Sequence, residues 1–173
     1  MRQLGTSGLA TPTLVLGGNV FGCTAKGEEG FRILDRFVAA GGTMIDTADV
    51  YSAWVPGHRG GESETFIGEW LRRRGRRDDV LIATKVGMLA GEGGKGLEPA
   101  RIAAAVEASL ARLGTDYVDL YYSHKDDPDV PLEETLAAFD RLVLAGKVRS
   151  IGASQIEAPR LAEALDIRER EGL

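Results

Sequence analysis

The chain carries four residues suited to proton transfer: Asp46, Tyr51, Lys85 and His124. The carboxylate, amine and imidazole are 39 residues apart each time (46 to 85 and 85 to 124), and the phenol follows the carboxylate closely. A free phenol, with a pKa of about 10, is a poor acid at neutral pH, but a nearby ammonium stabilises its phenolate. The ammonium in turn needs a carboxylate to stay charged in an apolar surrounding, and a neutral imidazole can hydrogen-bond a carbonyl oxygen and polarise it. Together these groups could protonate a carbonyl oxygen while another group delivers hydride to its carbon.

Taken singly, each of these residues also has a structural explanation: a turn cap, a lysine reaching solvent, a core histidine, a packed tyrosine ring. Their positions favour the chemical interpretation. Short apolar runs predict strands over residues 13–16, 43–46, 80–85, 117–123 and 148–153. Asp46, Lys85 and His124 stand at or directly after the ends of the second, third and fourth of these strands. Neighbouring parallel strands lie about 4.8 Å apart, so we expect the side chains to converge, with Tyr51 on the adjoining loop.

Residues between the predicted strands have helical spacing, and glycine or proline marks the helix ends. Gly41-Gly42, Gly75, Gly114 and Gly146 follow the last apolar positions, while Pro99 and Pro131 lie near helix starts. A fifth helix is predicted from Ala158 into Arg168, and residues 4–9 are typical of a small hairpin. The strands are apolar at consecutive positions, as in parallel sheets covered on both faces. The chain is therefore predicted to contain a hairpin and five βα units.

Two α/β folds compete for this pattern, taken as one domain over residues 1–173. An open, doubly wound five-stranded sheet fits the length, whereas a (β/α)₈ barrel usually needs about 250 residues. Length alone favours the open sheet. In both folds, active sites form at the carboxyl ends of the strands.

Composition excludes several classes of function. With 26 acidic and 21 basic residues and a net charge of -5, no positive field is available for nucleic acid or an anionic membrane. The arginine-rich run at 72–77 is followed at once by two aspartates. One cysteine, no predicted signal peptide and no predicted spanning helix indicate a cytoplasmic protein. Two histidines and one cysteine, far apart, predict no metal site.

Five segments carry a resemblance to a known family. They are Asp46-Thr47-Ala48-x-x-Tyr51, Gly61-Glu62-Ser63-Glu64, Ala83-Thr84-Lys85, Asp119-Leu120-Tyr121-Tyr122-Ser123-His124 and Val148-Arg149-Ser150-Ile151-Gly152-Ala153-Ser154. In this order they resemble the successive signatures of the aldo-keto reductases, and the segment at 4–9 is similar to the hairpin that opens them. The resemblance implies a (β/α)₈ barrel that uses NADPH to reduce aldehydes and ketones.

The resemblance also implies a role for each matching residue. Tyr51 would be the proton donor, Lys85 and Asp46 its tuning pair, and His124 the residue that orients the substrate carbonyl. The residues expected along the cofactor are Gly18, Asn19, Asp46, Ser154 and Gln155, with Ser154 reaching the nicotinamide amide. Trp54 is a candidate wall of the substrate pocket, because a flat apolar ring suits a carbonyl substrate, although ordinary loop packing explains it equally well.

The sequence departs from the family pattern at two points. Gln155 stands where the family usually has asparagine, and the sixth to eighth βα units have no counterpart. In the family those units include the aromatic residue that stacks on the nicotinamide and the basic site that binds the 2′-phosphate of the cofactor. We therefore expect a partial barrel, five of eight βα units, from a truncated or incompletely represented protein. Open strand edges predict self-association or a complementing chain.

Two alternatives to a reductase stay open. One is a non-catalytic fragment or a regulatory, partner-binding member of the family. The other is a flavodoxin-like FMN-binding domain, which the length favours but which needs a phosphate loop that Gly17-Gly18-Asn19-Val20 does not supply. The glycine-rich segment at 87–96 also fails the spacing of a phosphate loop and is interpreted as a loop bordering the site.

Overall fold

The computed structural model describes residues 2–5 and 7–172. A short antiparallel hairpin opens the chain, with β1 (Arg2–Gln3) paired to β2 (Ala10–Thr11). The hairpin predicted at 4–9 is its turn, closed by a hydrogen bond from Leu4 N–H to Leu9 O of 2.9 Å; position 6 of that prediction lies outside the described residues. Five βα units follow, so the predicted alternation is confirmed.

The bounds of the last four units agree closely with the sequence pattern, and those of the first differ at its strand. The strands are β3 (Leu16–Gly17), β4 (Met44–Asp46), β5 (Leu81–Val86), β6 (Val118–Ser123) and β7 (Val148–Ala153). The helices are α1 (Gly27–Ala39), α2 (Glu62–Arg74), α3 (Pro99–Leu113), α4 (Leu132–Leu144) and α5 (Ala158–Glu171). Helices α2 and α3 end at Gly75 and Gly114, both with φ 67°, a left-handed conformation that glycine adopts without strain.

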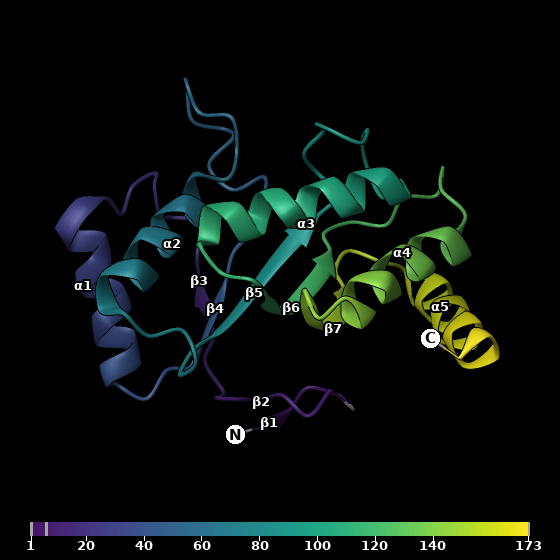
Figure 1. Cartoon of the computed structure of the whole chain (residues 1–173), viewed down its shortest axis with the longest axis horizontal. Coiled ribbons are helices and arrows are strands. Elements are labelled where there is room, and N and C mark those ends of the chain that lie inside the picture. The colour runs from purple at the N-terminus through teal and green to yellow at the C-terminus, as the bar shows by residue number, and fades with distance from the viewer. Residues whose placement is uncertain (1, 6, 173) are drawn as a thin grey trace.

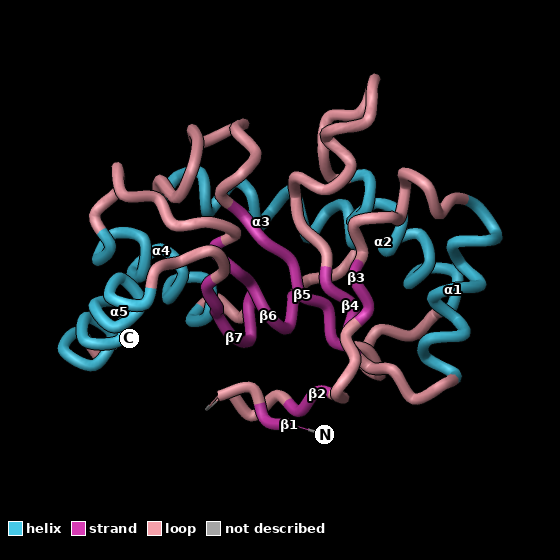
Figure 2. Tube along the Cα trace, turned by 180° about the vertical axis from the view of Figure 1, so that it is seen from behind, coloured by secondary structure: helices cyan, strands magenta, loops and turns pink. Residues whose placement is uncertain are grey.

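The order of the strands decides between the two folds. The sheet is parallel and runs β3-β4-β5-β6-β7, in the order of the chain. Figures 1 and 2 show the helices on one face of this sheet and the hairpin beneath the lower ends of the strands. A doubly wound sheet reverses its strand order and carries helices on both faces. The open, flavodoxin-like fold that length favoured is therefore wrong, and the chain forms five consecutive units of a (β/α)₈ barrel.

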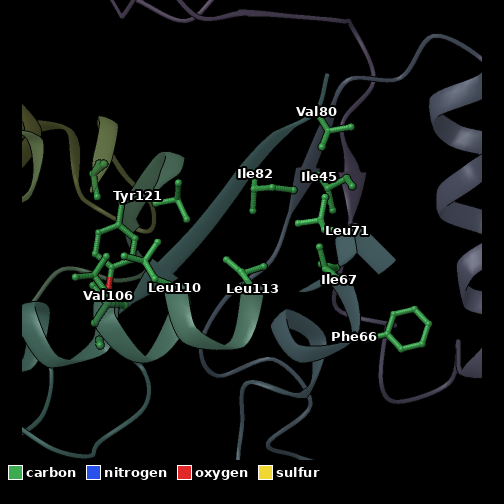
Figure 3. Close-up of a cluster of buried hydrophobic side chains, with 14 of the residues drawn as sticks. Ile45, Phe66, Ile67, Leu71, Val80, Ile82, Val106, Leu110, Leu113 and Tyr121 are labelled. Atoms are coloured by element: carbon green, nitrogen blue, oxygen red, sulfur yellow. The ribbon is translucent and has the colours of Figure 1, made fainter. Parts of the chain in front are cut away.

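Both faces of the strands are apolar, but they pack against different partners. Between sheet and helices lies the main core, which contains Ile45, Ile67, Ile82 and Leu113 (Figure 3). On the inner face, a smaller cluster of Met44, Ala83 and Leu120 is covered by Leu4 of the hairpin. Successive side chains of a strand point to opposite faces. The consecutive apolar residues therefore supply two cores, and the hairpin closes the floor of the inner one.

The first strand is shorter than predicted. It begins at Leu16 instead of residue 13, and Leu14 is 71% exposed. β3 pairs only with β4 among the described residues, through Leu16 with Ile45 and Gly17 with Asp46. The residues before Leu16 have no strand to pair with, so their apolar character alone does not make them a strand. None of the helices within residues 2–5 and 7–172 combines the length and apolar character needed to cross a membrane.

Candidate active site

Lys85 is the centre of the candidate site. It is the fifth residue of β5, faces the inner side of the sheet and is 7% exposed. Its ammonium donates to Asp46 Oδ2 at 2.6 Å, to the Thr47 carbonyl at 2.7 Å and to the Tyr51 hydroxyl at 3.0 Å. An ammonium has three protons, so each one is used. The lysine therefore joins the carboxylate at the end of β4 to the phenol on the following loop, as predicted.

Tyr51 lies on the loop from residue 47 to residue 61, which we call the Tyr51 loop. The loop turns sharply: Tyr51 N–H donates to the Ala48 carbonyl at 3.2 Å, and the next residue, Ser52, has a φ of 76°. A serine in this left-handed region stores backbone strain of about 1 kcal/mol or more. Ser52 is fully buried, and its hydroxyl donates to the Phe21 carbonyl at 3.3 Å. The surrounding structure therefore imposes the turn that directs the phenol toward Lys85.

His124 completes the group of four predicted side chains. It follows β6 directly, and its backbone N–H donates to the Val86 carbonyl at 2.8 Å. Its ring meets the Tyr51 ring edge-on, with centroids 5.8 Å apart and planes at 73°. Burial, with the positive charge of Lys85 adding to it, lowers the pKa of His124 from 6.5 to about 4. The imidazole is therefore neutral at pH 7 and can donate a hydrogen bond without carrying charge.

The predicted cofactor residues fall into two groups. Asp46 and Ser154 line a hollow of about 460 Å³ on the inner face of the sheet, together with Lys85 and Tyr122. Ser154 is held at the rim by its backbone N–H, which donates to the Ser123 carbonyl at 2.9 Å. One hollow thus joins Asp46 and Lys85 to the serine expected to reach a nicotinamide amide, while Tyr51 and His124 do not line it.

The other predicted cofactor residues lie differently. Gly18 is buried: it donates to the Asp46 carbonyl at 2.7 Å, and a Cβ there would approach that same oxygen to 2.8 Å. Asn19 is exposed on the following turn. Gln155, with a φ of 49°, turns its side chain back and donates from Nε2 to the His124 carbonyl at 3.0 Å. In this structure Gly18 therefore helps to fix the position of Asp46, and Gln155 helps to fix that of His124.

Trp54 lies beside the phenol at the mouth of the site. It is 57% exposed, and its ring contacts the Tyr51 ring edge-on with centroids 6.1 Å apart. The exposed indole is therefore available to a substrate that reaches Tyr51. No group of three or more metal-binding side chains occurs within the described ranges.

Comparison with known proteins adds the family. The profile of the Aldo/keto reductase family matches residues 13–172, which is nearly the whole chain. The chain belongs to this family.

Reductases from fungi and bacteria are similar to this aldo/keto reductase chain. Aldo-keto reductase str7 of Strobilurus tenacellus is 39% identical over 144 residues, 83% of this chain and 40% of the relative. Norsolorinic acid reductase stcV of Emericella nidulans is 40% identical over 154 residues, 84% of this chain and 38% of the relative. Aldo-keto reductase YhdN of Bacillus subtilis is 36% identical over 151 residues, 86% and 43% respectively. The chain spans about two fifths of the length of these relatives.

Two features of this aldo/keto reductase site were not predicted. The Thr47 carbonyl, the third partner of Lys85, gives no signal in a sequence because every residue has a carbonyl. Tyr122 lies on the floor of the hollow, where burial and the charge of Asp46 raise its pKa. This makes it a weaker acid than an ordinary tyrosine. The sequence could have indicated this, because Tyr122 stands two residues before His124 and side chains two apart in a strand point to the same face.

A buried ion pair behind the site was also missed. Asp49 of the Tyr51 loop is fully buried and accepts a hydrogen bond from Arg101 Nη2 at 3.3 Å. No sequence signal marked Arg101, because at about 100° per residue it lies off the apolar stripe of residues 102, 106, 110 and 113.

Proposed function

We propose that this chain carries the proton-transfer centre of an NADPH-dependent reductase of aldehydes and ketones, with Tyr51 as the proton donor. The observation that supports this most directly is the ammonium of Lys85, bonded at once to the Asp46 carboxylate and the Tyr51 hydroxyl. The reductase names of the relatives support the same class of reaction. Because the chain spans only part of their length, the activity of the whole protein is part of the proposal.

In the proposed reaction the O–H of Tyr51 donates its proton to the carbonyl oxygen of the substrate. The ammonium of Lys85, 3.0 Å away, stabilises the phenolate that is left. Asp46 keeps that ammonium charged in its buried position. The neutral imidazole of His124 donates a hydrogen bond to the same carbonyl oxygen and holds it beside the phenol.

The residues around the hollow suit the amide end of a nicotinamide. Ser154 offers a hydroxyl at the rim, and Gln155 keeps its side-chain oxygen available because its Nε2 binds His124. In the proposal Ser154, Gln155 and Asp46 hold the cofactor, with Gly18 and Asn19 on the neighbouring turn. When bound, NADPH would supply the hydride that reduces the carbonyl carbon. This part of the proposal rests on the type of donor groups and on the hollow that Asp46 and Ser154 share.

The substrate in this proposal is a carbonyl compound with a flat apolar part. Trp54 presents an exposed ring next to Tyr51, and such a ring packs well against another planar surface. Three of the relatives are named norsolorinic acid reductases, and these names support a reductase activity for this chain. Which carbonyl compound this chain reduces is decided by assay of a set of aromatic and aliphatic aldehydes and ketones.

The test combines cofactor binding with turnover. NADPH is titrated into the full chain while tryptophan fluorescence is recorded, and the oxidation of NADPH by a simple aldehyde is followed in parallel. We expect Tyr51→Phe to keep cofactor binding but to lower kcat by about 100-fold or more, because it removes the proton donor. Tyr117→Phe is the matched control, since Tyr117 stacks between Arg77 and Arg149 away from the hollow. Full activity of Tyr51→Phe, or no binding at millimolar NADPH, would refute the proposal.

A further inference from the structure

A second group of charged residues lies buried on the opposite side of β5 from Lys85. Thr84 and Lys85 are adjacent in the strand, so their side chains point to opposite faces. Thr84 donates to Glu64 of α2 at 2.5 Å, which places Glu64 on the helix side. Glu64 and Asp49 are fully buried, and Arg101 is 6% exposed. Charged residues are rarely buried to this extent, because removing each one from water costs several kcal/mol.

Arg101, in the first turn of α3, contacts both loops that border the candidate site. Its Nη2 donates to Asp49 Oδ2 in the Tyr51 loop at 3.3 Å, and its Nη1 donates to the Glu92 carbonyl at 3.1 Å. Glu92 belongs to the loop at residues 87–97, which we call the glycine loop. Gly91 of this loop lies so close that a Cβ there would be 2.8 Å from Nη1. One guanidinium therefore holds two loops that are separate in the sequence.

Asp49 connects this guanidinium to the phenol. Its backbone N–H donates to the Lys85 carbonyl at 3.2 Å, and two residues later the hydroxyl of Tyr51 accepts from the ammonium of the same lysine. Asp49 is thus tied to β5 by its backbone and to α3 by its side chain. A shift of Asp49 must move the turn that carries Tyr51.

The two loops also touch directly. A Cβ at Gly60, in the Tyr51 loop, would lie 3.0 Å from a methyl carbon of Leu89 in the glycine loop. The glycine loop is itself closed by reciprocal backbone hydrogen bonds of 3.0 Å between Gly91 and Gly94. Beside Leu89, Met88 is 49% exposed. Losing the guanidinium contact would therefore affect both loops together.

The charge of Asp49 is sensitive to pH near neutrality. Burial and the negative charge of Glu64 raise the pKa of Asp49 to about 7, against the opposing charges of Arg101 and Arg112 on α3. The charge of Asp49 in turn contributes to the raised pKa of Tyr121 on β6. Its Oδ1 is buried and has no hydrogen-bond partner among the described residues. The ion pair with Arg101 therefore strengthens above about pH 7 and weakens below it.

We propose that Asp49 and Arg101 are positioning residues, which hold Tyr51 against Lys85 and keep the glycine loop folded beside it. The contacts described above are the whole basis for the claim that the pair holds the two loops. The effect on proton transfer, in contrast, rests on the proposed reductase function. A group held by its neighbours before the substrate binds does not have to be ordered during the reaction. The pair would act through Tyr51 without touching the substrate.

The loop contact is tested on the full chain without assuming a reaction. Trp54 reports on the Tyr51 loop because it is 57% exposed and packs on Tyr51, whereas Trp70 is 2% exposed. Acrylamide quenching of tryptophan fluorescence therefore measures mainly Trp54. We expect the quenching constant to rise as the pH falls through about 7. In Asp49→Asn and Arg101→Met the quenching constant should be higher than in the parent at every pH, and it should not change as the pH passes through about 7.

Matched controls keep this test specific. The parent and all variants carry His58→Asn. This substitution removes the other titratable imidazole, which belongs to the Tyr51 loop, from the pH dependence. Arg77→Met removes another partly buried arginine, paired with Asp119 at 2.7 Å near the amino end of β6, and should quench like the parent. If Arg101→Met does not fold, Arg101→Lys is used, because it keeps the charge but loses the two-pronged contact. Parent-like quenching in the Asp49 and Arg101 variants, or an equal rise in Arg77→Met, would overturn the proposal.

The effect on proton transfer is measured separately. In the carbonyl reduction assay we expect Asp49→Asn to lower kcat by about 10- to 100-fold and to leave the KM for NADPH unchanged. The kcat of the parent should fall as the pH drops through about 7, where Asp49 takes up a proton, and this step should be absent in Asp49→Asn. An unchanged kcat and pH profile would overturn the positioning role. If the parent chain reduces no carbonyl compound, the proposed function fails, while the quenching results still decide whether the pair holds the loops.

Discussion

The charge state of His124 is the most direct quantitative test of the site. The pKa of this imidazole is lowered from 6.5 to about 4, first by burial and then by the charge of Lys85. At about 1.4 kcal/mol per pKa unit, the difference corresponds to about 3 kcal/mol against the imidazolium. Replacing Lys85 by methionine removes the smaller cause and leaves burial in place. We therefore expect the pKa of His124 in Lys85→Met to rise, but by less than half of the difference between 4 and 6.5.

The assay is an NMR titration of the imidazole. The chain has two histidines, so His58→Asn leaves a single imidazole signal to follow. In that background the His124 shifts should stay constant from about pH 8 to about pH 5.5 and change only below, whereas an ordinary histidine titrates near 6.5. A His124 that titrates near 6.5, or one whose pKa does not rise in Lys85→Met, would refute the electrostatic description of the site.

The free energy of unfolding should follow the same titration. The unfolded chain binds a proton at His124 below about 6.5 and the folded chain only near 4, so stability falls as the pH drops through this range, by up to about 3 kcal/mol. Asp49 has the opposite sign, because its folded pKa of about 7 lies above 3.8, and its contribution to stability grows as the pH falls from 7 to 3.8. In the parent these two terms oppose each other, so urea unfolding of His124→Gln should show stability rising more steeply than in the parent as the pH falls from about 7 to about 4.5. An equal dependence would contradict the assignment.

Two further predictions concern packing and association. Gly68→Ala, in the interior of α2, normally would stabilise a helix by about 1 kcal/mol. Here the new Cβ would meet the backbone of Arg112 and lie 2.8 Å from that of Leu113, so urea unfolding should show a loss of about 3 kcal/mol, and a gain would refute the close helix contact. A groove of about 620 Å³ along β7 and α5 leaves Ile151 and Leu165 38% and 53% exposed. We expect the sedimentation coefficient to rise with concentration and Leu165→Glu to suppress this; a concentration-independent parent would contradict it.

Several features of the fold were predictable because they depend on neighbours in the sequence. Gly75 and Gly114 mark the ends of α2 and α3, since a residue with positive φ is needed there whatever the tertiary structure. The convergence of Asp46 and Lys85 was predictable as well. Each lies at the carboxyl end of a strand in consecutive βα units. Consecutive parallel strands are neighbours in this sheet, so the two side chains meet in a hydrogen bond of 2.6 Å.

Other features depend on contacts that no local pattern contains. Length favoured an open sheet and the family resemblance a partial barrel, and the strand order with the helices on one face confirmed the partial barrel. The side-chain Nε2 of Gln155 donates to the carbonyl of His124, a contact that the sequence does not reveal. Arg101 joins two loops through a residue 52 positions away. A side chain with several possible partners takes the one that folding brings within reach. Residue types and spacing therefore determined which chemistry this protein could contain, and the packing of distant segments decided which groups meet.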